Sequence, residues 1–204
     1  MTLLIADLSN NNGSLPLIVD EIAKHKNFAG VIFKITEGTH FVDTTAVAGI
    51  KRARHHGLKV GGYHFFHASQ PTLAQARLFV NSAHRAGLWR KGDIRPVLDY
   101  EVEPDGHESS HRNAFYGEVH RLTGHNSILY AGGAFTTWLP APKGSHAWWA
   151  AGYPNYVKNS SLGRPWLHQF TDSYPVGPYR IDCSRVRGIF KRRVLNRNCC
   201  AVGG

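Results

Sequence analysis

Apolar, β-branched runs alternate with helix-period stretches through the first two thirds of the chain. The runs predict strands over Leu3–Leu8, Gly30–Thr36, Lys59–Phe66, Pro96–Glu101 and Ser127–Ala131. Between them, apolar residues recur every three or four positions and predict helices over Leu15–Lys26, Thr44–His56, Thr72–Ala86 and Ser110–Leu122. Repeated strand, helix, strand units favour parallel strands joined by right-handed crossovers.

The pattern changes after residue 131. Three short aromatic strands are predicted over Ala147–Tyr153, Pro165–Thr171 and Tyr179–Cys183, and Pro- and Gly-rich loops between them leave little room for helices. An α/β fold with eight strands and helices missing from the last third indicates a small, irregular (β/α) barrel. The same strand count also fits an open sheet with a hairpin at one edge.

Length and charge narrow the class of protein. A chain of 204 residues with 42% hydrophobic residues fits a single folded domain, which we expect over 1–188, followed by a basic tail over 189–204. No apolar run is long enough to predict membrane insertion. The first seven residues lack the basic start and the apolar length of a signal peptide. A net charge of +10 favours anionic surroundings.

The end of the chain is its most basic part. Its cationic residues are Arg180, Arg185, Arg187, Lys191, Arg192, Arg193 and Arg197. Nucleic-acid-binding segments have similar density, but no nucleic-acid motif accompanies this one, so we expect a solvated tail and no specific nucleic-acid partner. Cys183, Cys199 and Cys200 are too few and too clustered for a disulfide framework, and we interpret Cys199 and Cys200 as free thiols.

Candidate chemistry begins with the tetrapeptide Leu98-Asp99-Tyr100-Glu101. Side chains alternate along a strand, so Asp99 and Glu101 should face the same way with Cα atoms roughly 6.5 to 7 Å apart. Paired carboxylates suit the cleavage of glycosidic bonds, because one delivers a proton while the other stays ionised beside the cationic transition state. An isolated D-x-E triplet also occurs by chance on solvated turns.

Other polar residues follow the predicted strands where a barrel would carry its site, at the carboxyl ends. They are Asp7, Thr36, Glu37, Tyr63, His64, Gln169 and Asp182. Turn capping or core packing would explain some of them singly, but their shared position favours one site. Aromatic rings suit sugar faces, and from the tryptophan-rich last third we select Trp149 and Trp166 for a substrate groove.

Seven motifs occur in a fixed order along roughly residues 3 to 188. They are Asp7-Leu8-Ser9 with Gly13, Lys34-Ile35-Thr36-Glu37-Gly38, Gly61-Gly62-Tyr63-His64-Phe65, Leu98-Asp99-Tyr100-Glu101, Trp149-Ala150-Ala151-Gly152-Tyr153, Trp166-Leu167-His168-Gln169-Phe170 and Ile181-Asp182. In these motifs the chain resembles the glycoside hydrolase family 25 lysozymes, which are N-acetylmuramidases. It departs from the family pattern at Cys183-Ser184, where an apolar residue and Asn are usual, and in the run Asn10-Asn11-Asn12.

The resemblance implies an irregular β/α barrel that cleaves the β-1,4 bond between N-acetylmuramic acid and N-acetylglucosamine, with no metal and no cofactor. By matching position, Glu101 would be the general acid and Asp99 would stabilise the developing positive charge, directly or through the acetamide of the sugar. Asp7 and Asp182 would flank them. The expected substrate-binding residues are Glu37, Tyr63, His64, Tyr130, Trp149, Trp166 and Gln169.

The expected partner is bacterial peptidoglycan, and we expect the protein to be a monomer. A phage lysin that leaves the cytoplasm of an infected cell and then attacks the wall would fit the missing leader.

Two alternatives belong to other classes. The stretch His107-Glu108-Ser109-Ser110-His111 matches the H-E-x-x-H pattern of zinc hydrolases, but Pro104-Asp105-Gly106 interrupts the chain before it, where the motif needs a buried helix. The other alternative is a non-catalytic wall-binding protein on the same barrel, and the retention of every acidic position argues against it.

Overall fold

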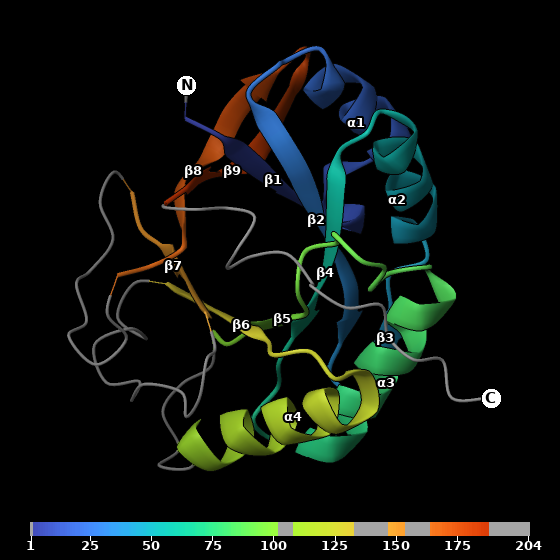
Figure 1. The fold of residues 1–204 in the computed structure, drawn as a ribbon, viewed down its shortest axis with the longest axis vertical. Coiled ribbons are helices and arrows are strands. Elements are labelled where there is room, and N and C mark those ends of the chain that lie inside the picture. Colours follow the sequence, from blue (N-terminus) through green and yellow to red (C-terminus); the bar gives the residue numbers. More distant parts are fainter. Residues whose placement is uncertain (1, 102–107, 133–146, 154–163, 188–204) are drawn as a thin grey trace.

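A closed barrel of eight strands forms the centre of the computed structural model, which describes residues 2–101, 108–132, 147–153 and 164–187 (Figure 1). The barrel strands are β1 (Leu4–Leu8), β2 (Phe28–Glu37), β4 (Lys59–Phe65), β5 (Val97–Asp99), β6 (Ile128–Gly132), β7 (Ala147–Ala151), β8 (Leu167–Val176) and β9 (Tyr179–Val186). They follow the order β1-β9-β8-β7-β6-β5-β4-β2, and pairing of β2 with β1 closes the ring. The predicted barrel is confirmed, and the open sheet is wrong.

The last two barrel strands differ in direction from the others. β8 runs parallel to β7 over Leu167–Gln169, whereas β9 is antiparallel to both β8 and β1. Asp182 therefore does not stand at the carboxyl end of a parallel strand, as the sequence suggested. It lies within β9, where the β1–β9 register sets it directly opposite Asp7. A short strand that was not predicted, β3 (Phe41–Val42), pairs with the end of β2.

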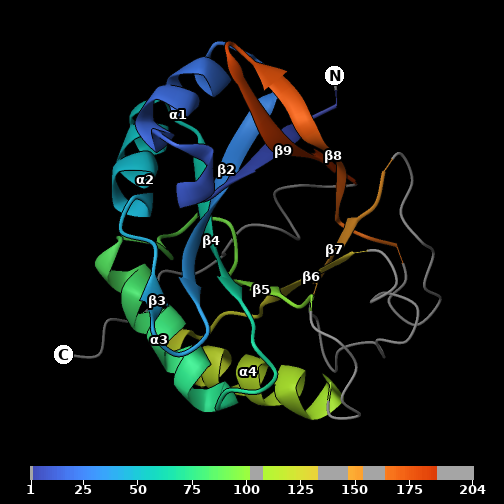
Figure 2. The same cartoon turned by 180° about the vertical axis from the view of Figure 1, so that it is seen from behind.

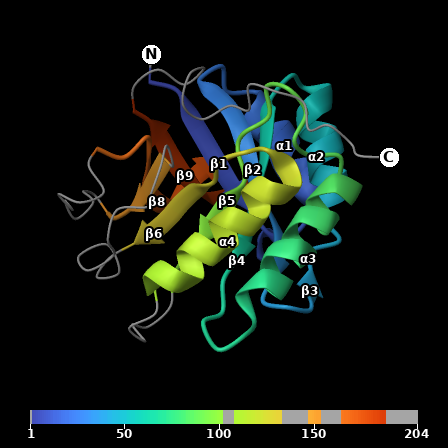
Figure 3. The same ribbon diagram turned by 60° about the horizontal axis from the view of Figure 1, so that its bottom comes forward.

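In the described part of the chain, four α-helices pack outside the barrel, each within a few residues of its predicted range. They are α1 (Leu15–Ala23), α2 (Ala46–His55), α3 (Thr72–Arg85) and α4 (Glu108–Thr123). α1 pairs with α2, and α3 lies beside α4 (Figures 2 and 3). After residue 132 the described residues form strands and connections, in agreement with the predicted loss of helices. Among the described residues, no helix combines the length and apolarity that a membrane span requires.

Alternation of side chains along the strands separates two apolar clusters. On β2, Val31 and Phe33 point outward and pack beneath the helices, whereas Ile32 points into the barrel. Beyond them, the β2–β4 register shifts between Lys34 and Thr36. This irregularity brings Lys34 and Glu37 close enough for an ion pair at the end of the strand, three residues apart.

Gly62 on β4 occupies a position with no room for a side chain. A Cβ atom there would lie 2.6 Å from Cγ1 of Ile35 and 2.7 Å from Cδ1 of Leu88, two residues that pack in the outer core. Glycine at this position therefore lets the sheet and the segment after α3 approach each other closely.

We expect Gly62→Ala to lower the free energy of unfolding by about 1–3 kcal/mol, because the added methyl group overpacks the core. The matched control is Gly117→Ala on the exposed side of α4, where a Cβ would meet no atom within 4 Å. That change should raise stability by up to about 1 kcal/mol through helix propensity. Urea unfolding measures both, and equal effects at the two glycines would contradict the close approach at Gly62.

Candidate active site

A cavity of about 310 Å³ opens at the end of the barrel where the parallel strands have their carboxyl ends. Eight of the residues predicted for the site line it, namely Asp7, Tyr63, Asp99, Glu101, Tyr130, Trp149, Gln169 and Asp182. Glu37, His64 and Trp166 were predicted with them but do not line the cavity. Most of the predicted set is thus brought together from seven different strands or strand ends.

The D-x-E pair faces the cavity although the strand is shorter than predicted. β5 ends at Asp99, but the Tyr100 N–H still donates to the Tyr130 carbonyl at 2.9 Å. The alternation therefore continues for two more residues. Tyr100 turns outward and stacks on Phe66 with ring centroids 5.2 Å apart, while Asp99 and Glu101 both reach the cavity.

The other two carboxylates come from β1 and β9, the two strands that follow β2 around the ring. Asp7 on β1 and Asp182 on β9 are direct partners in an antiparallel pair, so their side chains share one face of the sheet. Asp7 is 9% exposed and Asp99 is 8% exposed, so both carboxylates are held away from solvent. Four carboxylates therefore meet in one small space.

Burial dominates the electrostatics of these groups. It raises the pKa of Asp7 and of Asp99 well above the usual range, and neighbouring carboxylates raise both further. The pKa of Glu101 is raised by burial and by Asp182. Burial and Asp172 raise the pKa of Asp182 to about 6. The cluster consequently holds protons at a pH where isolated carboxylates would have lost them.

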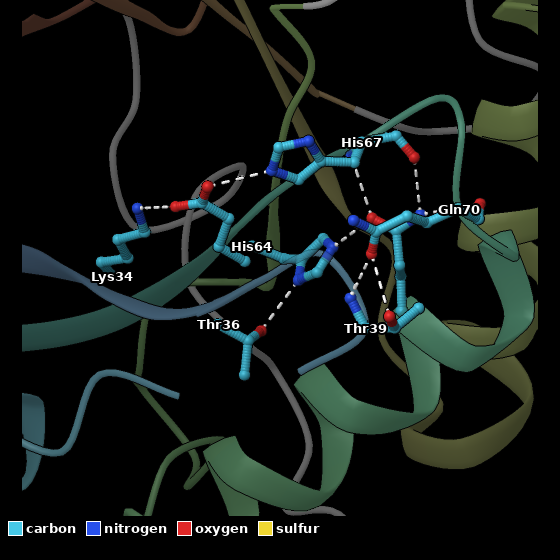
Figure 4. Close-up of polar contacts among 8 residues, drawn as sticks. Lys34, Thr36, Thr39, His64, His67 and Gln70 are labelled. Carbon is cyan, nitrogen blue, oxygen red and sulfur yellow. Dashed lines mark hydrogen bonds and ion pairs between the residues drawn. The ribbon is translucent and has the colours of Figure 1, made fainter. Parts of the chain in front are cut away.

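Lys34 is the cation among the described residues that line the cavity. Its ammonium group lies 5.3 Å from the ring centroids of both Phe41 and Phe65, and it forms an ion pair with Glu37. The second oxygen of Glu37 lies 2.9 Å from Nε2 of His67 (Figure 4). The charge of Lys34 lowers the pKa of Asp99 and so opposes the effect of burial. Glu37 holds Lys34 in place, and its own charge raises the pKa of Asp99.

His64 points away from the cavity and into the helical layer. Its Nδ1 lies 2.8 Å from the Thr36 hydroxyl and its Nε2 lies 3.1 Å from Oε1 of Gln75 (Figure 4). The ring also stacks on Phe115 with centroids 5.2 Å apart. Burial lowers the pKa of His64 to about 4, so the ring is neutral at pH 7. In the sequence, the alternation from Tyr63 to His64 was the signal that only one of them could face inward.

The two selected tryptophans lie in different places. Trp149 lines the cavity, where its Nε1 donates to the Ser184 hydroxyl at 2.9 Å and its ring meets Tyr130 edge to face. Trp166 stands before the first residue of β8 and packs on the inner cluster, with the Arg95 guanidinium 5.5 Å from its ring. Since Arg95 precedes β5, this contact lies at the amino-terminal end of the barrel strands, opposite the cavity.

The run Asn10-Asn11-Asn12, noted as a departure in the sequence, forms a short 3-10 helix after β1. Ser9 caps it, because its hydroxyl accepts from the Asn11 N–H at 3.3 Å while the Asn12 side chain accepts from the Ser9 N–H at 2.8 Å. Ser9, Asn11 and Asn12 all line the cavity. Reasoning from strand ends missed these residues, although the Ser-Asn-Asn-Asn capping pattern was there to be found.

Two further parts of the sequence prediction concern residues outside the described ranges. His107 of the H-E-x-x-H stretch is one of them, and its partner His111 lies in α4 with Nδ1 3.1 Å from the Thr72 hydroxyl. Within the described ranges, no group of three His, Cys, Asp or Glu side chains is placed to hold a metal ion. The tail over 189–204, with Cys199 and Cys200, also lies outside, whereas Cys183 is buried in β9.

Comparison with known proteins agrees with the motifs. A sequence model described as glycosyl hydrolases family 25 matches residues 6–178. The chain belongs to glycosyl hydrolases family 25. It is 32% identical over 126 residues to the uncharacterized protein YegX of Escherichia coli K12, a match that covers 59% of this chain and 44% of YegX. This family 25 chain thus spans less than half of the curated relative it matches.

Solved structures show the same fold. A family GH25 lysozyme from Aspergillus fumigatus superposes with a TM-score of 0.78 at 23% identity, over 96% of this chain and 100% of the lysozyme. The catalytic domain of endolysin ply40 from bacteriophage P40 of Listeria monocytogenes gives a TM-score of 0.74 at 23% identity, over 92% and 94% of the two chains. The family 25 barrel is therefore shared across low sequence identity.

The raised pKa of Asp182 predicts how stability depends on pH. The folded protein favours the neutral carboxyl, so ionisation destabilises the fold as the pH rises from about 4 to about 6. Asp182→Asn should therefore unfold at the same urea concentration as the parent chain near pH 4. Above about pH 6 it should be the more stable of the two.

Asp20→Asn on the protein surface is the matched control with the opposite sign. Hydrogen bonds from Arg52 and His56 lower the pKa of Asp20 to about 2, so its charge stabilises the fold at neutral pH. This variant should be less stable above about pH 4, and the difference should vanish as the pH falls towards 2. If the effect of Asp182→Asn did not depend on pH, burial would not raise the pKa of Asp182.

Proposed function

We propose that this chain is a peptidoglycan hydrolase, a lysozyme that cleaves the β-1,4 bond between N-acetylmuramic acid and N-acetylglucosamine. Membership of family 25 supports the substrate class. The observation that carries the proposal is the meeting of Asp7, Asp99, Glu101 and Asp182 in one cavity where burial raises their pKa values. Glycosidic cleavage needs one carboxyl that is protonated at neutral pH beside another that is ionised.

In this proposal Glu101 is the general acid. Burial and the charge of Asp182 raise its pKa, which keeps a proton available for the leaving oxygen of the sugar. Lys34 acts on the other member of the pair, where its positive charge lowers the pKa of Asp99 and favours the ionised form there. Burial nevertheless keeps the pKa of Asp99 well above its usual value, so the assignment of the proton to Glu101 follows from its place in the L-D-x-E motif.

Asp99 is the proposed stabiliser of the transition state. Its Oδ1 is buried and has no hydrogen-bond partner among the described residues. An unpaired buried oxygen is costly, so a donor on the substrate would relieve this cost. The N–H of the sugar acetamide is such a donor, and Asp99 would orient the acetamide or face the developing positive charge directly.

Aromatic side chains complete the proposed binding surface. Tyr63, Tyr130 and Trp149 line the walls of the cavity, and their rings offer flat faces for sugars. The cavity volume of about 310 Å³ is at the lower end of the range for ligand pockets, which fits a site for part of a longer glycan. The net charge of +10 would favour approach to an anionic wall.

The likeness to a phage endolysin domain supports one proposal about biological setting. The protein would be made in the cytoplasm of an infected cell and would act as a monomer on the wall after release.

Digestion of purified peptidoglycan in the presence of EDTA tests the function. We expect fragments with reducing N-acetylmuramic acid ends, which mass spectrometry after borohydride reduction identifies. Fragments that appear only without EDTA would favour the zinc alternative. A folded protein that binds the wall and releases no fragments would be a binding protein instead.

Glu101→Gln should lower kcat by about 100-fold or more, because the amide cannot deliver the proton. Folding and sedimentation with the wall should be retained, since the change is isosteric. The assignment of the acid would fail if this variant kept a rate near that of the parent chain.

Asp99→Asn should lower kcat by about 100- to 1000-fold, as the loss of a preorganised charge does. Steady-state kinetics on soluble glycan fragments separates kcat from KM. A rise in KM alone would make Asp99 a binding residue and not a stabiliser of the transition state.

A further inference from the structure

The side-chain amide of Gln169 forms hydrogen bonds with three side chains of the protein. Its Oε1 accepts from the hydroxyls of Tyr130 at 2.9 Å and Tyr153 at 2.7 Å. Its Nε2 lies 3.1 Å from Oδ1 and 3.2 Å from Oδ2 of Asp7, to which it donates. An amide has two acceptor positions and two N–H groups. Both acceptor positions of Gln169 are filled by tyrosine hydroxyls, and its nitrogen donates to both oxygens of a single carboxylate.

The two tyrosines and Asp7 together set the direction of these hydrogen bonds. Both tyrosine hydroxyls point at one end of the amide, which is its oxygen, so the amide nitrogen faces Asp7 and the carboxyl oxygens accept. Both tyrosine hydroxyls consequently donate to Gln169, and their oxygens present lone pairs to the cavity. Tyr130 is 9% exposed, whereas Tyr153 is 50% exposed and therefore meets the solvent at the mouth.

The backbone of Gln169 holds the same segment as its side chain. The Gly152 N–H donates to the Gln169 carbonyl at 3.2 Å, next to Tyr153. On the other side of β8 the register with β9 shifts between Gln169 and Thr171, where the barrel strand continues into a hairpin. Such irregularities re-aim side chains near sites. Gln169 thus holds both the main chain at Gly152 and the hydroxyl of Tyr153, which lies at the cavity mouth.

Burial and the charges of Asp182 and Glu101 oppose the ionisation of Asp7. The charge of Asp7 in turn raises the pKa values of its neighbours on the packed strands, which are Cys183 on β9, Asp99 on β5, Tyr63 on β4, Tyr130 on β6 and Tyr153. The hydrogen bonds from Gln169 act in the other direction and lower the pKa of Asp7. The amide is therefore the group that favours the ionised form of Asp7.

We propose that Gln169 is a positioning residue that couples Tyr153 at the mouth of the cavity to Asp7 at its floor. A sugar hydroxyl or acetamide N–H that donates to the Tyr153 oxygen polarises the tyrosine O–H, and this strengthens the chain of hydrogen bonds through the amide to Asp7. Occupation of the mouth then steadies the carboxylate that borders Glu101. The glycan as donor rests on the proposed function, whereas the coupling itself does not.

The test compares Gln169→Met with Gln75→Met. Gln75 is a matched control because it is also a buried glutamine whose amide makes four hydrogen bonds, to His64, twice to His67 and to Gln70, away from the cavity. Loss of the Gln169 amide should raise the pKa of Asp7. The pH profile of kcat should therefore move to higher pH, whichever protonation state of Asp7 the reaction uses, and kcat should fall by up to about 100-fold. Gln75→Met should leave the profile in place.

A measurement without substrate separates this proposal from the proposed function. A higher pKa of Asp7 in the folded state makes ionisation more destabilising, so the stability lost in Gln169→Met should grow as the pH rises through the range above about pH 5 in which the folded protein ionises Asp7. The loss in Gln75→Met should be constant over that range, because His64 titrates at about 4 and stays neutral there. If the parent chain fails to cleave peptidoglycan but this difference appears, the coupling stands and the function falls.

Tyr153→Phe keeps the proposal falsifiable if Gln169→Met does not fold. The ring is half exposed, so the loss of its hydroxyl should leave the fold intact. The pH profile of the Phe variant should move in the same direction as for Gln169→Met, by less, and KM should rise. The coupling is overturned if Tyr153→Phe keeps the parent profile, or if Gln169→Met loses the same stability at every pH.

Discussion

The position of β1 is the constraint on which the rest of the site depends. β1 pairs with β2 in parallel and with β9 in antiparallel orientation, and these two pairings close the barrel. Closure removes the edges that an open sheet would leave, and it also fixes the register that sets Asp7 opposite Asp182. The two carboxylates from the ends of the described chain are thereby brought across the barrel from Asp99 and Glu101. Without the closing pairs, the site would be two separate halves.

Four carboxyls in one cavity repel one another when they ionise. Two neighbouring side chains, Lys34 and Gln169, favour the ionised form at particular members of the cluster. Lys34 supplies a positive charge beside Asp99, and its own position is set by Glu37 and two aromatic rings. Gln169 supplies hydrogen bonds to Asp7. Burial raises the pKa values of the carboxyls, and these two neighbours oppose the shift at particular members. The proton is thereby favoured on some carboxyls over others, and acid catalysis depends on such a difference.

The sequence predicted the elements well because each has a strong local pattern. The helices begin and end within a few residues of their predicted ranges, and the eight barrel strands were all anticipated. Prediction of the site was less complete. The turn after β1, with Ser9, Asn11 and Asn12, was missed because its capping pattern lies outside any strand. Trp166 and His64 were predicted to belong to the site. Trp166 instead stands at the start of β8 beside Arg95, and His64, the neighbour of Tyr63, faces Thr36 and the helices.

The sequence by itself determined the order of strands and helices, the D-x-E pair and the motifs of family 25. These are local properties, because side-chain alternation and helical periodicity depend on residues only a few positions apart. The tertiary structure alone decided the direction of β9, the opposition of Asp7 and Asp182, and the contact of Gln169 with two tyrosines and Asp7. Each of these joins residues distant in the chain, and their pairing follows from register and closure, which no local pattern specifies.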